Sequence, residues 1–181
     1  MKFVFDNTLQ DLVAFAKHYY RSSHAMSRMR SKMFRFIVGI VVAGALVAAF
    51  QEESVRPLVF AGIFIAVYSV FHLLISPRLE DSMVTAQARG MFGDGENKAL
   101  YGPREIEITD DAVTERSKYH EHTTRWAAVE KIIETPTHAF IYWCAASAYA
   151  IPRASVSDET YRMFLNAAKS AWEAAKSRPE Q

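Results

Sequence analysis

The chain contains two nearly continuous apolar runs, Phe34–Phe50, FRFIVGIVVAGALVAAF, and Leu58–Ile75, LVFAGIFIAVYSVFHLLI, which are joined by the seven residues QEESVRP. The hydrocarbon core of a bilayer is about 30 Å thick, and a helix needs about 17–25 apolar residues to cross it. Both runs reach the lower part of this range, and the polar link between them is short. The two runs therefore predict a transmembrane helical hairpin.

Ionisable side chains are nearly absent from these runs. Arg35 and His72 lie within about a turn of an end, where a long side chain can reach the headgroup region. A soluble protein with a buried helical pair is the alternative, and a mean hydropathy near zero over the whole chain would suit it. The average mixes the apolar runs with strongly polar flanks, however, so length and flanking charge together favour insertion into a membrane.

The basic residues around the hairpin predict its orientation, because Lys and Arg are retained on the cytoplasmic side. The basic residues on the two flanks of the hairpin are Arg21, Arg28, Arg30, Lys32, Arg35 and Arg78. The connecting link carries Glu52 and Glu53 against the single Arg56. We therefore expect a multi-pass protein of the plasma (inner) membrane with both termini in the cytoplasm. The lone cysteine, Cys144, agrees with a reducing compartment and is expected to be a buried, inert thiol.

Arg28, Arg30, Lys32 and Arg35 form the first candidate binding site. Basic residues next to a membrane attract anionic lipid headgroups, at about 1 kcal/mol for each residue. Membrane lipids with anionic headgroups are thus one expected partner. The alternative is that these charges only set the topology, and the sequence leaves both interpretations open.

The remaining segments predict an α+β fold around the hairpin. Residues 1–32 indicate an N-terminal strand followed by an amphipathic helix, docked on the C-terminal domain or on the membrane surface. The hairpin occupies 33–76. Residues 77–103 indicate a juxtamembrane helix, ending at Arg89, and a glycine-rich joint from Gly90 onward. Residues 104–178 would form the cytosolic domain.

The cytosolic domain is expected to be a small antiparallel meander capped by a helix. Arg104–Thr109 alternates polar with apolar residues, which is typical of a half-buried strand. Further strands are expected at Val113–Tyr119, Val129–Glu134, Ala139–Cys144 and Ala148–Ile151. Ser157 with two acidic residues then predicts the start of the last helix, whose apolar face is Tyr161, Phe164, Leu165, Ala168 and Trp172.

Several segments of this domain resemble the YcxB-like family. They are IEITDDAVTE (106–115), TTRWAAVEKIIET (123–135), HAFIYW (138–143), AYAIPRASV (148–156) and MFLNAA (163–168), in this order. The resemblance also covers the two upstream spans and implies a bacterial membrane protein with a two-span anchor. It further implies a pleckstrin-homology-like barrel closed by the C-terminal helix. It brings no catalytic residues.

Few residues suggest chemistry. His120 and His122 are two apart, so in a strand both rings would face the same side and reach one metal ion. No cysteine or third ligand accompanies them, and a solvated strand end is the simpler interpretation. Arg153, next to Pro152, would suit a phosphate or a partner but would suit solvent equally well. Trp126 and Val129 are expected to pack in the core.

These patterns favour a membrane-anchored cytosolic binding or regulatory module that is not an enzyme and needs no cofactor. The alternative is a small enzyme or a metal- or ligand-binding domain that uses the barrel around His120 and His122. Acidic residues slightly outnumber basic ones between Arg104 and Arg153, so nucleic acid is not an expected partner. A protein partner is expected, but neither its identity nor the oligomeric state can be predicted.

Overall fold

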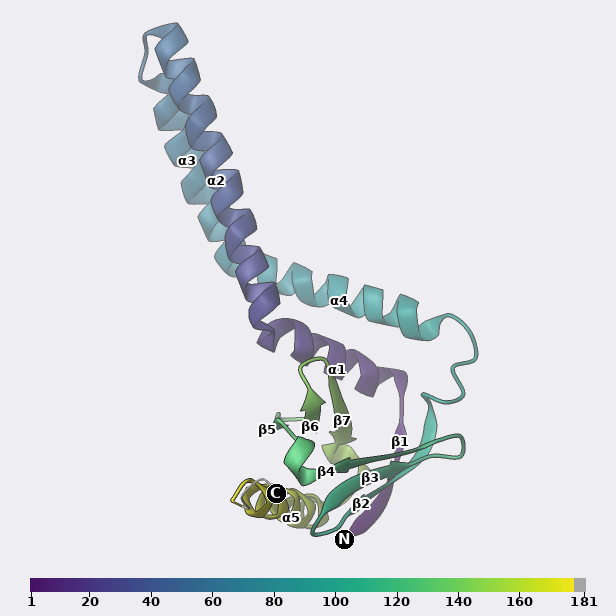
Figure 1. Ribbon diagram of the computed structural model, residues 1–181. Helices are drawn as coiled ribbons and strands as arrows, with labels where there is room; N and C mark the ends of the chain where they lie inside the picture. The colour runs from purple at the N-terminus through teal and green to yellow at the C-terminus, as the bar shows by residue number, and fades with distance from the viewer. Residues whose placement is uncertain (178–181) are drawn as a thin grey trace. The chain divides into compact units, whose positions relative to one another are not determined.

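The computed structural model describes residues 1–177, apart from the side chains of residues 76 and 77. The chain divides into two compact units (Figure 1). Met1–Ala16 and the chain from Gln87 onward form the first, and Lys17–Ala86 forms the second. The first unit, called here the sheet unit, combines antiparallel strands with a helix. The second, the helical unit, contains the two apolar runs, so the predicted mixture of helix and antiparallel sheet is confirmed.

The helical unit is built around two long helices, α2 (His24–Glu52) and α3 (Arg56–Leu74). The turn between them is made by Glu53 in the left-handed conformation, with φ of 50°, and by a proline in the first turn of α3. The α2 helix begins at the cap residue Ser23, whose hydroxyl accepts a hydrogen bond from the Met26 amide.

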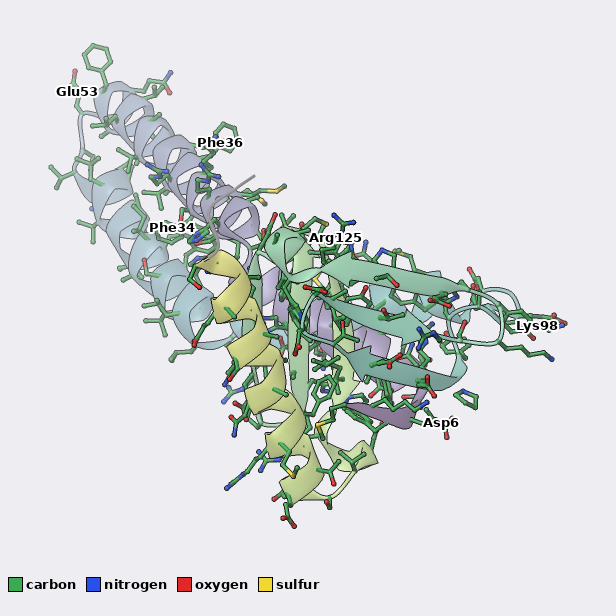
Figure 2. All side chains as sticks on the ribbon, turned by 60° about the horizontal axis from the view of Figure 1, so that its bottom comes forward. Asp6, Phe34, Phe36, Glu53, Lys98 and Arg125 are labelled. Atoms are coloured by element: carbon green, nitrogen blue, oxygen red, sulfur yellow. The ribbon has the colours of Figure 1, made fainter. Side chains whose placement is uncertain are left out.

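The apolar side chains of α2 and α3 are exposed. Figure 2 shows the Phe36 ring projecting outward from α2, and this side chain is 69% exposed. Within the most apolar window of α2 only 6% of the residues are buried, and within that of α3 none are. A buried helical pair of a soluble core would show the opposite pattern. Two helices that are long and apolar enough to cross a membrane are therefore present, as predicted.

The sheet unit contains two antiparallel sheets. The first has the order β1-β2-β3-β4, and the second has the order β5-β6-β7. The strands are β1 (Lys2–Asn7), β2 (Gly102–Ile108), β3 (Ala112–Arg116), β4 (Glu121–Arg125), β5 (Lys131–Glu134), β6 (His138–Cys144) and β7 (Ser147–Pro152). Neighbouring strands in each sheet follow one another in strand order, so both sheets are meanders. Between β1 and β2, however, the chain also contains the long helices α2 and α3.

Strand β1 pairs with a strand that lies on the other side of the hairpin in the sequence. The antiparallel register runs from Lys2 opposite Glu107 to Asn7 opposite Gly102. The chain therefore leaves the sheet unit only for residues 17–86, which include both apolar helices, and returns to it before β2. The predicted N-terminal strand is thus an integral part of the first sheet.

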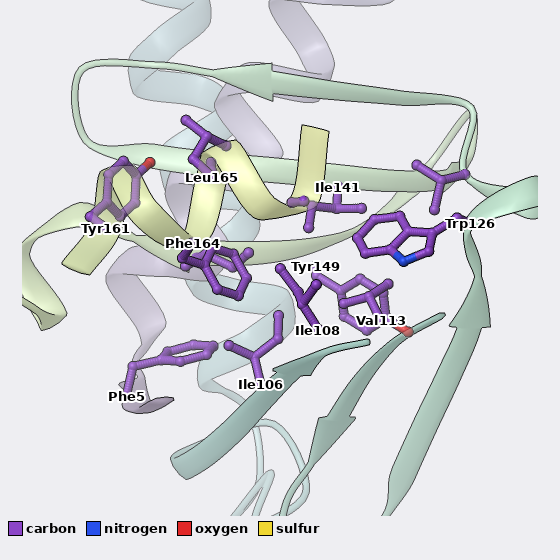
Figure 3. Packing of buried hydrophobic residues seen from close by; sticks show 14 residues of the cluster. Phe5, Ile106, Ile108, Val113, Trp126, Ile141, Tyr149, Tyr161, Phe164 and Leu165 are labelled. Carbon is purple, nitrogen blue, oxygen red and sulfur yellow. The ribbon is translucent and has the colours of Figure 1, made fainter. Parts of the chain in front are cut away.

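Helix α5 (Asp158–Lys176) covers the core between the two sheets. It begins at Ser157, whose hydroxyl accepts the Thr160 amide at 3.2 Å. Its predicted apolar face is confirmed, since Tyr161, Phe164, Leu165 and Ala168 are all buried. Figure 3 shows how these side chains pack with those of both sheets. The buried cluster consists of Phe5, Ile106, Ile108, Val113, Trp126, Val129, Ala139, Ile141, Tyr149, Ile151, Tyr161, Phe164, Leu165 and Ala168.

The start of helix α1 (Leu9–Ser22) is fastened to the second sheet by Asp11. The Thr8 amide and hydroxyl donate to Asp11 Oδ2 at 2.7 and 2.6 Å, which caps the helix. The other carboxylate oxygen lies 3.0 Å from Nε2 of His138 in β6. Burial raises the pKa of Asp11, but the hydrogen bonds from His138 and Thr8 outweigh it and hold the pKa below its ordinary value. Phe15 extends this contact against Phe140, with ring centroids 5.8 Å apart.

The barrel implied by the family resemblance is not closed. Over the described residues, no strand ladder joins β4 to β5 or β7 to β1. The chain between β4 and β5 is a short 3₁₀ turn, η1 (Trp126–Ala128), which ends the first sheet and turns the chain into the second. The two sheets are instead held together by the shared core and by α5.

The largest difference from the predicted strands lies around residues 112–125. The strand expected at Val113–Tyr119 ends at Arg116, because Ser117 begins a hairpin loop in which its hydroxyl accepts the amides of Tyr119 and His120. The chain then returns as β4, a strand that was not predicted. Only Thr124 of β4 is buried, so its sequence lacks the apolar alternation of a half-buried strand.

The juxtamembrane helix is longer than predicted. Helix α4 (Ser76–Gly93) continues through Gly90, where the glycine-rich joint was expected to begin. Its last turn is held from beyond the helix, because Asn97 Nδ2 donates to the Phe92 carbonyl at 2.9 Å and the Tyr101 hydroxyl donates to the same oxygen. The joint is therefore the shorter segment between Gly93 and β2.

The predicted burial of Trp126 is confirmed, and it gives the first testable prediction. The indole is 0% exposed, and its Nε1 donates to the Thr109 carbonyl at 2.9 Å. Trp126→Ala should lower the free energy of unfolding by about 3–5 kcal/mol, because it leaves a large cavity between the sheets. Thermal unfolding of the detergent-solubilised protein, followed by near-ultraviolet circular dichroism, measures the loss.

Met163→Ala is the matched control, since Met163 lies on the outer face of α5 and is 57% exposed. This substitution should change stability by no more than about 0.5 kcal/mol. Equal effects of the two substitutions would contradict a core role for Trp126.

Candidate functional site

A cavity of about 330 Å³ lies in the sheet unit and is lined by side chains from both sheets and from the start of α1. Its polar lining residues are Asn7, Arg104, Glu115, His120 and His122. Its remaining lining residues are Leu12, Leu100, Trp143, Ala148, Tyr149 and Ala150. The cavity thus combines ionisable groups with an apolar and aromatic wall, which is the usual composition of a small-molecule site.

A buried ion pair forms the floor of the polar part. Arg104 of β2 and Glu115 of β3 are 8% and 7% exposed, and Arg104 Nη1 contacts Glu115 Oε1. Arg104 Nη2 also donates to the carbonyls of Ala99 and Leu100 at 2.9 and 3.0 Å. Removing either partner of such a pair leaves a buried charge without compensation and costs about 3–5 kcal/mol.

His120 lies in the loop before β4 and contacts this pair. Its Nε2 is 3.3 Å from Arg104 Nη1, and its Nδ1 is 3.0 Å from the Ser117 hydroxyl. A guanidinium can only donate, so Nε2 is the acceptor and the proton is carried by Nδ1. Burial, followed by the charges of Arg104 and His122, lowers the pKa of His120. These effects favour a neutral ring that is held by hydrogen bonds on both nitrogens.

His122 of β4 belongs to an aromatic cluster that lines the same cavity. Its Nδ1 lies 2.6 Å from the Tyr149 hydroxyl, which is also 2.9 Å from the Thr124 hydroxyl. The His122 ring lies 4.7 Å from the Trp143 ring, and the Trp143 ring lies 4.4 Å from that of Tyr149. The Tyr149 ring is buried beside Val113 in the core (Figure 3), so this cluster connects the cavity to the core.

The structure brings His120 and His122 to the same cavity, and both residues are exposed. Their partners differ, because His120 contacts Arg104 and His122 contacts Tyr149. Among the described residues, no group of three or more His, Cys, Asp or Glu side chains could hold a metal ion. The pair therefore contributes polar groups to the cavity without a third ligand beside it.

Arg153 lies outside this cavity. Its Nε donates to Asp158 Oδ1 at 3.0 Å, and its guanidinium carbon lies 5.8 Å from the centre of the Tyr161 ring. The side chain thus covers the start of α5 and is 31% exposed. The ion pair with Asp158 engages Nε, and a role of Arg153 in binding a phosphate or a partner stays a prediction.

The basic cluster before the first apolar run is divided between two faces of α2. Arg28, Lys32 and Arg35 are spaced at i, i+4 and i+7, so they share one face, and all three are exposed. Arg30 is on another face, where its Nη1 contacts Glu80 Oε2 of α4 at 2.6 Å and its guanidinium lies over the Tyr20 ring. Three of the four residues predicted to bind lipid are therefore exposed, and Arg30 is engaged in an ion pair.

Cys144 was expected to be buried, but it is half-exposed. The residue ends β6, next to a bulge, and the turn to β7 exposes its side chain. A hydrogen bond from the Ser147 hydroxyl lowers the pKa of the thiol.

Arg104 and Glu115 were not predicted to belong to a site. A signal for Arg104 was present, because it is in phase with Ile106 and Ile108 along β2 and must point to the same inner face. A charged residue on the apolar face of a strand requires a buried partner. No comparable signal identified Glu115, since that inference depends on the pairing of β2 with β3.

No family model, curated protein or solved structure matches this chain.

The geometry of His120 and His122 gives a prediction about metals. Divalent zinc should leave the thermal midpoint of the solubilised protein unchanged, because both ring nitrogens of His120 already have hydrogen-bond partners and no third ligand lies beside the pair among the described residues. Replacing both His by Ala should cost about 0.5–1.5 kcal/mol, mainly through the lost hydrogen bond to Tyr149. This cost is larger than an exposed position alone would predict. A zinc-dependent rise in midpoint that disappears in the double variant would instead establish a metal site.

Proposed function

We propose that this protein is a membrane-anchored binding module that is not an enzyme, with its sheet unit in the cytoplasm and α2 and α3 crossing the membrane. The observation that carries this proposal is the pairing of β1 with β2 on either side of the apolar helices. The resemblance to YcxB-like proteins, with their two-span anchor and helix-capped sheet, supports the same function.

The β1–β2 pairing restricts how the helices can cross a bilayer. Asn7 and Gly102 are opposite each other in the ladder, so both must lie on the same side of the membrane. The segment between them must then cross an even number of times. A single crossing would separate β1 from its partner, whereas α2 and α3 together return the chain to the side from which it started.

The distribution of charges supports a cytoplasmic location for this side. Arg28, Lys32 and Arg35 are exposed at the start of α2, while the turn between the two helices carries Glu52 and Glu53. Basic residues are retained in the cytoplasm. The sheet unit is therefore cytoplasmic, and the short α2–α3 turn lies outside.

The contacts in the cavity favour binding over catalysis. The Glu115 carboxylate is paired with Arg104, and His120 accepts from the same guanidinium, so neither is available as a general base. His122 is held against Tyr149. A second function, a ligand-handling domain around His120 and His122, is favoured by the fact that both line one cavity. The two proposals share the cavity and differ only in whether a reaction takes place there.

Single cysteines test the anchor. In a Cys144→Ala background, Ser54→Cys in the α2–α3 turn should react with a membrane-impermeant maleimide on intact cells. Ser177→Cys at the end of the sheet unit and Lys98→Cys in the joint should react only after the cells are permeabilised. The physical reason is that both cytoplasmic positions belong to the unit whose first sheet contains β1 and β2.

Labelling of Lys98→Cys or Ser177→Cys on intact cells would overturn this topology. Labelling of Ser54→Cys only after permeabilisation would do the same. Labelling of the two sheet-unit positions on opposite sides would contradict the even number of crossings.

The exposed face of α2 gives a prediction about lipids. In nanodiscs that contain anionic lipid, amides of residues 24–35 should exchange hydrogen more slowly than in zwitterionic nanodiscs. Each basic residue near an anionic surface contributes about 1 kcal/mol. Replacing Arg28, Lys32 and Arg35 together by Gln should remove the difference, and Arg30→Gln should remove little of it because Arg30 is paired with Glu80.

The matched control removes three exposed positive charges from the sheet unit, at Lys98, Lys118 and Arg125. This control should exchange like the wild type in both lipids. Equal exchange of residues 24–35 in the two lipid compositions would mean that the basic residues only set the topology.

A further inference from the structure

The cavity holds polar groups that the fold itself leaves unused. Arg104 is 8% exposed, and its Nε is buried without a hydrogen-bond partner among the described residues. The exposed His122 and the half-buried Trp143 also line this cavity, and their rings pack together in the aromatic cluster. A buried donor without a partner costs free energy, so such a group indicates that something binds to it.

The unpartnered Arg104 Nε favours a ligand that accepts hydrogen bonds, because a guanidinium can only donate. The fixed charges of Arg104 and Glu115 face each other and balance, and the other ionisable side chains that line the cavity are His120, His122 and Tyr149. Burial raises the pKa of Tyr149, so its phenol stays neutral.

The rest of the wall favours an apolar body. Leu12, Leu100, Ala148 and Ala150 line the cavity together with the half-buried Trp143 ring. The volume of about 330 Å³ lies at the lower end of the range for small-molecule sites, which is about 300–1,000 Å³. A ligand about the size of one substituted ring is therefore appropriate, and a large cofactor is not.

We propose that this cavity binds a small organic carboxylate with an apolar, ring-sized body. The carboxylate accepts hydrogen bonds from Arg104 Nε, from His122 Nε2 and from the Trp143 indole, and the body packs against Trp143, Leu12 and Leu100. The inference rests on the proposed function as a binding module and specifies the ligand class of its cavity.

Phenylacetate is a suitable probe, and isothermal titration of the full-length protein in detergent measures its affinity. Phenylacetamide has the same shape without the charge, and acetate has the charge without the ring. Inorganic phosphate tests for a general anion site. Phenylacetate should bind at least about tenfold more tightly than each of the other three, and it should raise the thermal midpoint, because a ligand that binds only the folded state stabilises it.

Two substitutions test the assignment of the site. Trp143→Phe keeps an aromatic ring but removes the indole donor, and His122→Gln removes the ring nitrogen. Each should weaken phenylacetate binding by about tenfold, the effect of losing one hydrogen bond to a charged group. His24→Gln, at an exposed position of α2, is the matched control and should bind like the wild type. The thermal midpoint of each variant without ligand shows that it is folded.

Equal binding of phenylacetamide would overturn the anionic part of the proposal, and equal binding of acetate or phosphate would overturn the apolar part. The absence of both heat and a midpoint shift with phenylacetate would overturn it entirely. Unchanged affinity in folded Trp143→Phe and His122→Gln would place the ligand elsewhere. The cysteine labelling at Ser54 and Ser177 is independent of all these results, so failure of the ligand proposal is distinguishable from failure of the anchored topology.

Discussion

The pairing of β1 with β2 is the contact on which the rest of the structure depends. It joins residues 2–7 to residues 102–108 and so makes one sheet from the two ends of a long intervening segment. The entropy cost of closing a loop grows slowly, by about 0.6 kcal/mol for each doubling of its length, so a long insertion between paired strands is tolerated. Here the insertion is itself ordered, because α2 and α3 lie side by side and reverse the direction of the chain.

The same pairing also builds the cavity. Asn7 ends β1, and its Nδ2 donates to the Leu100 carbonyl at 2.6 Å, the same carbonyl that Arg104 Nη2 binds. Two side chains from paired strands thus hold the joint before β2 in place, and the joint supplies Leu100 to the cavity wall. The side chain of Arg104, which is paired with Glu115, therefore shares the Leu100 carbonyl with Asn7 of β1. Fold and candidate site depend on one set of contacts.

The elements that depend on residues close together in the sequence were predicted correctly. The apolar runs, the capped helix at Ser157 and the burial of Trp126 with Val129 all follow from neighbouring residues. Pairing across residues 8–101 has no local signature, so the partner of β1 was not predicted. Strand β4 was missed because four of its five residues are exposed. The cavity could be predicted only in part, since its two His residues are two positions apart in sequence whereas Arg104, Glu115, Trp143 and Tyr149 meet through tertiary structure.

The separation of β1 from its partner also determines an order of events during synthesis. Gly102 is translated about 95 residues after Asn7, which takes about 5–20 s at about 5–20 residues per second. During this interval the ribosome delivers both apolar helices, while the aromatic strand Lys2–Asn7 has no partner to pair with. An unpaired strand is a template for aggregation. The nascent chain must therefore keep its first strand soluble until the hairpin has emerged, and the sheet can close only afterwards.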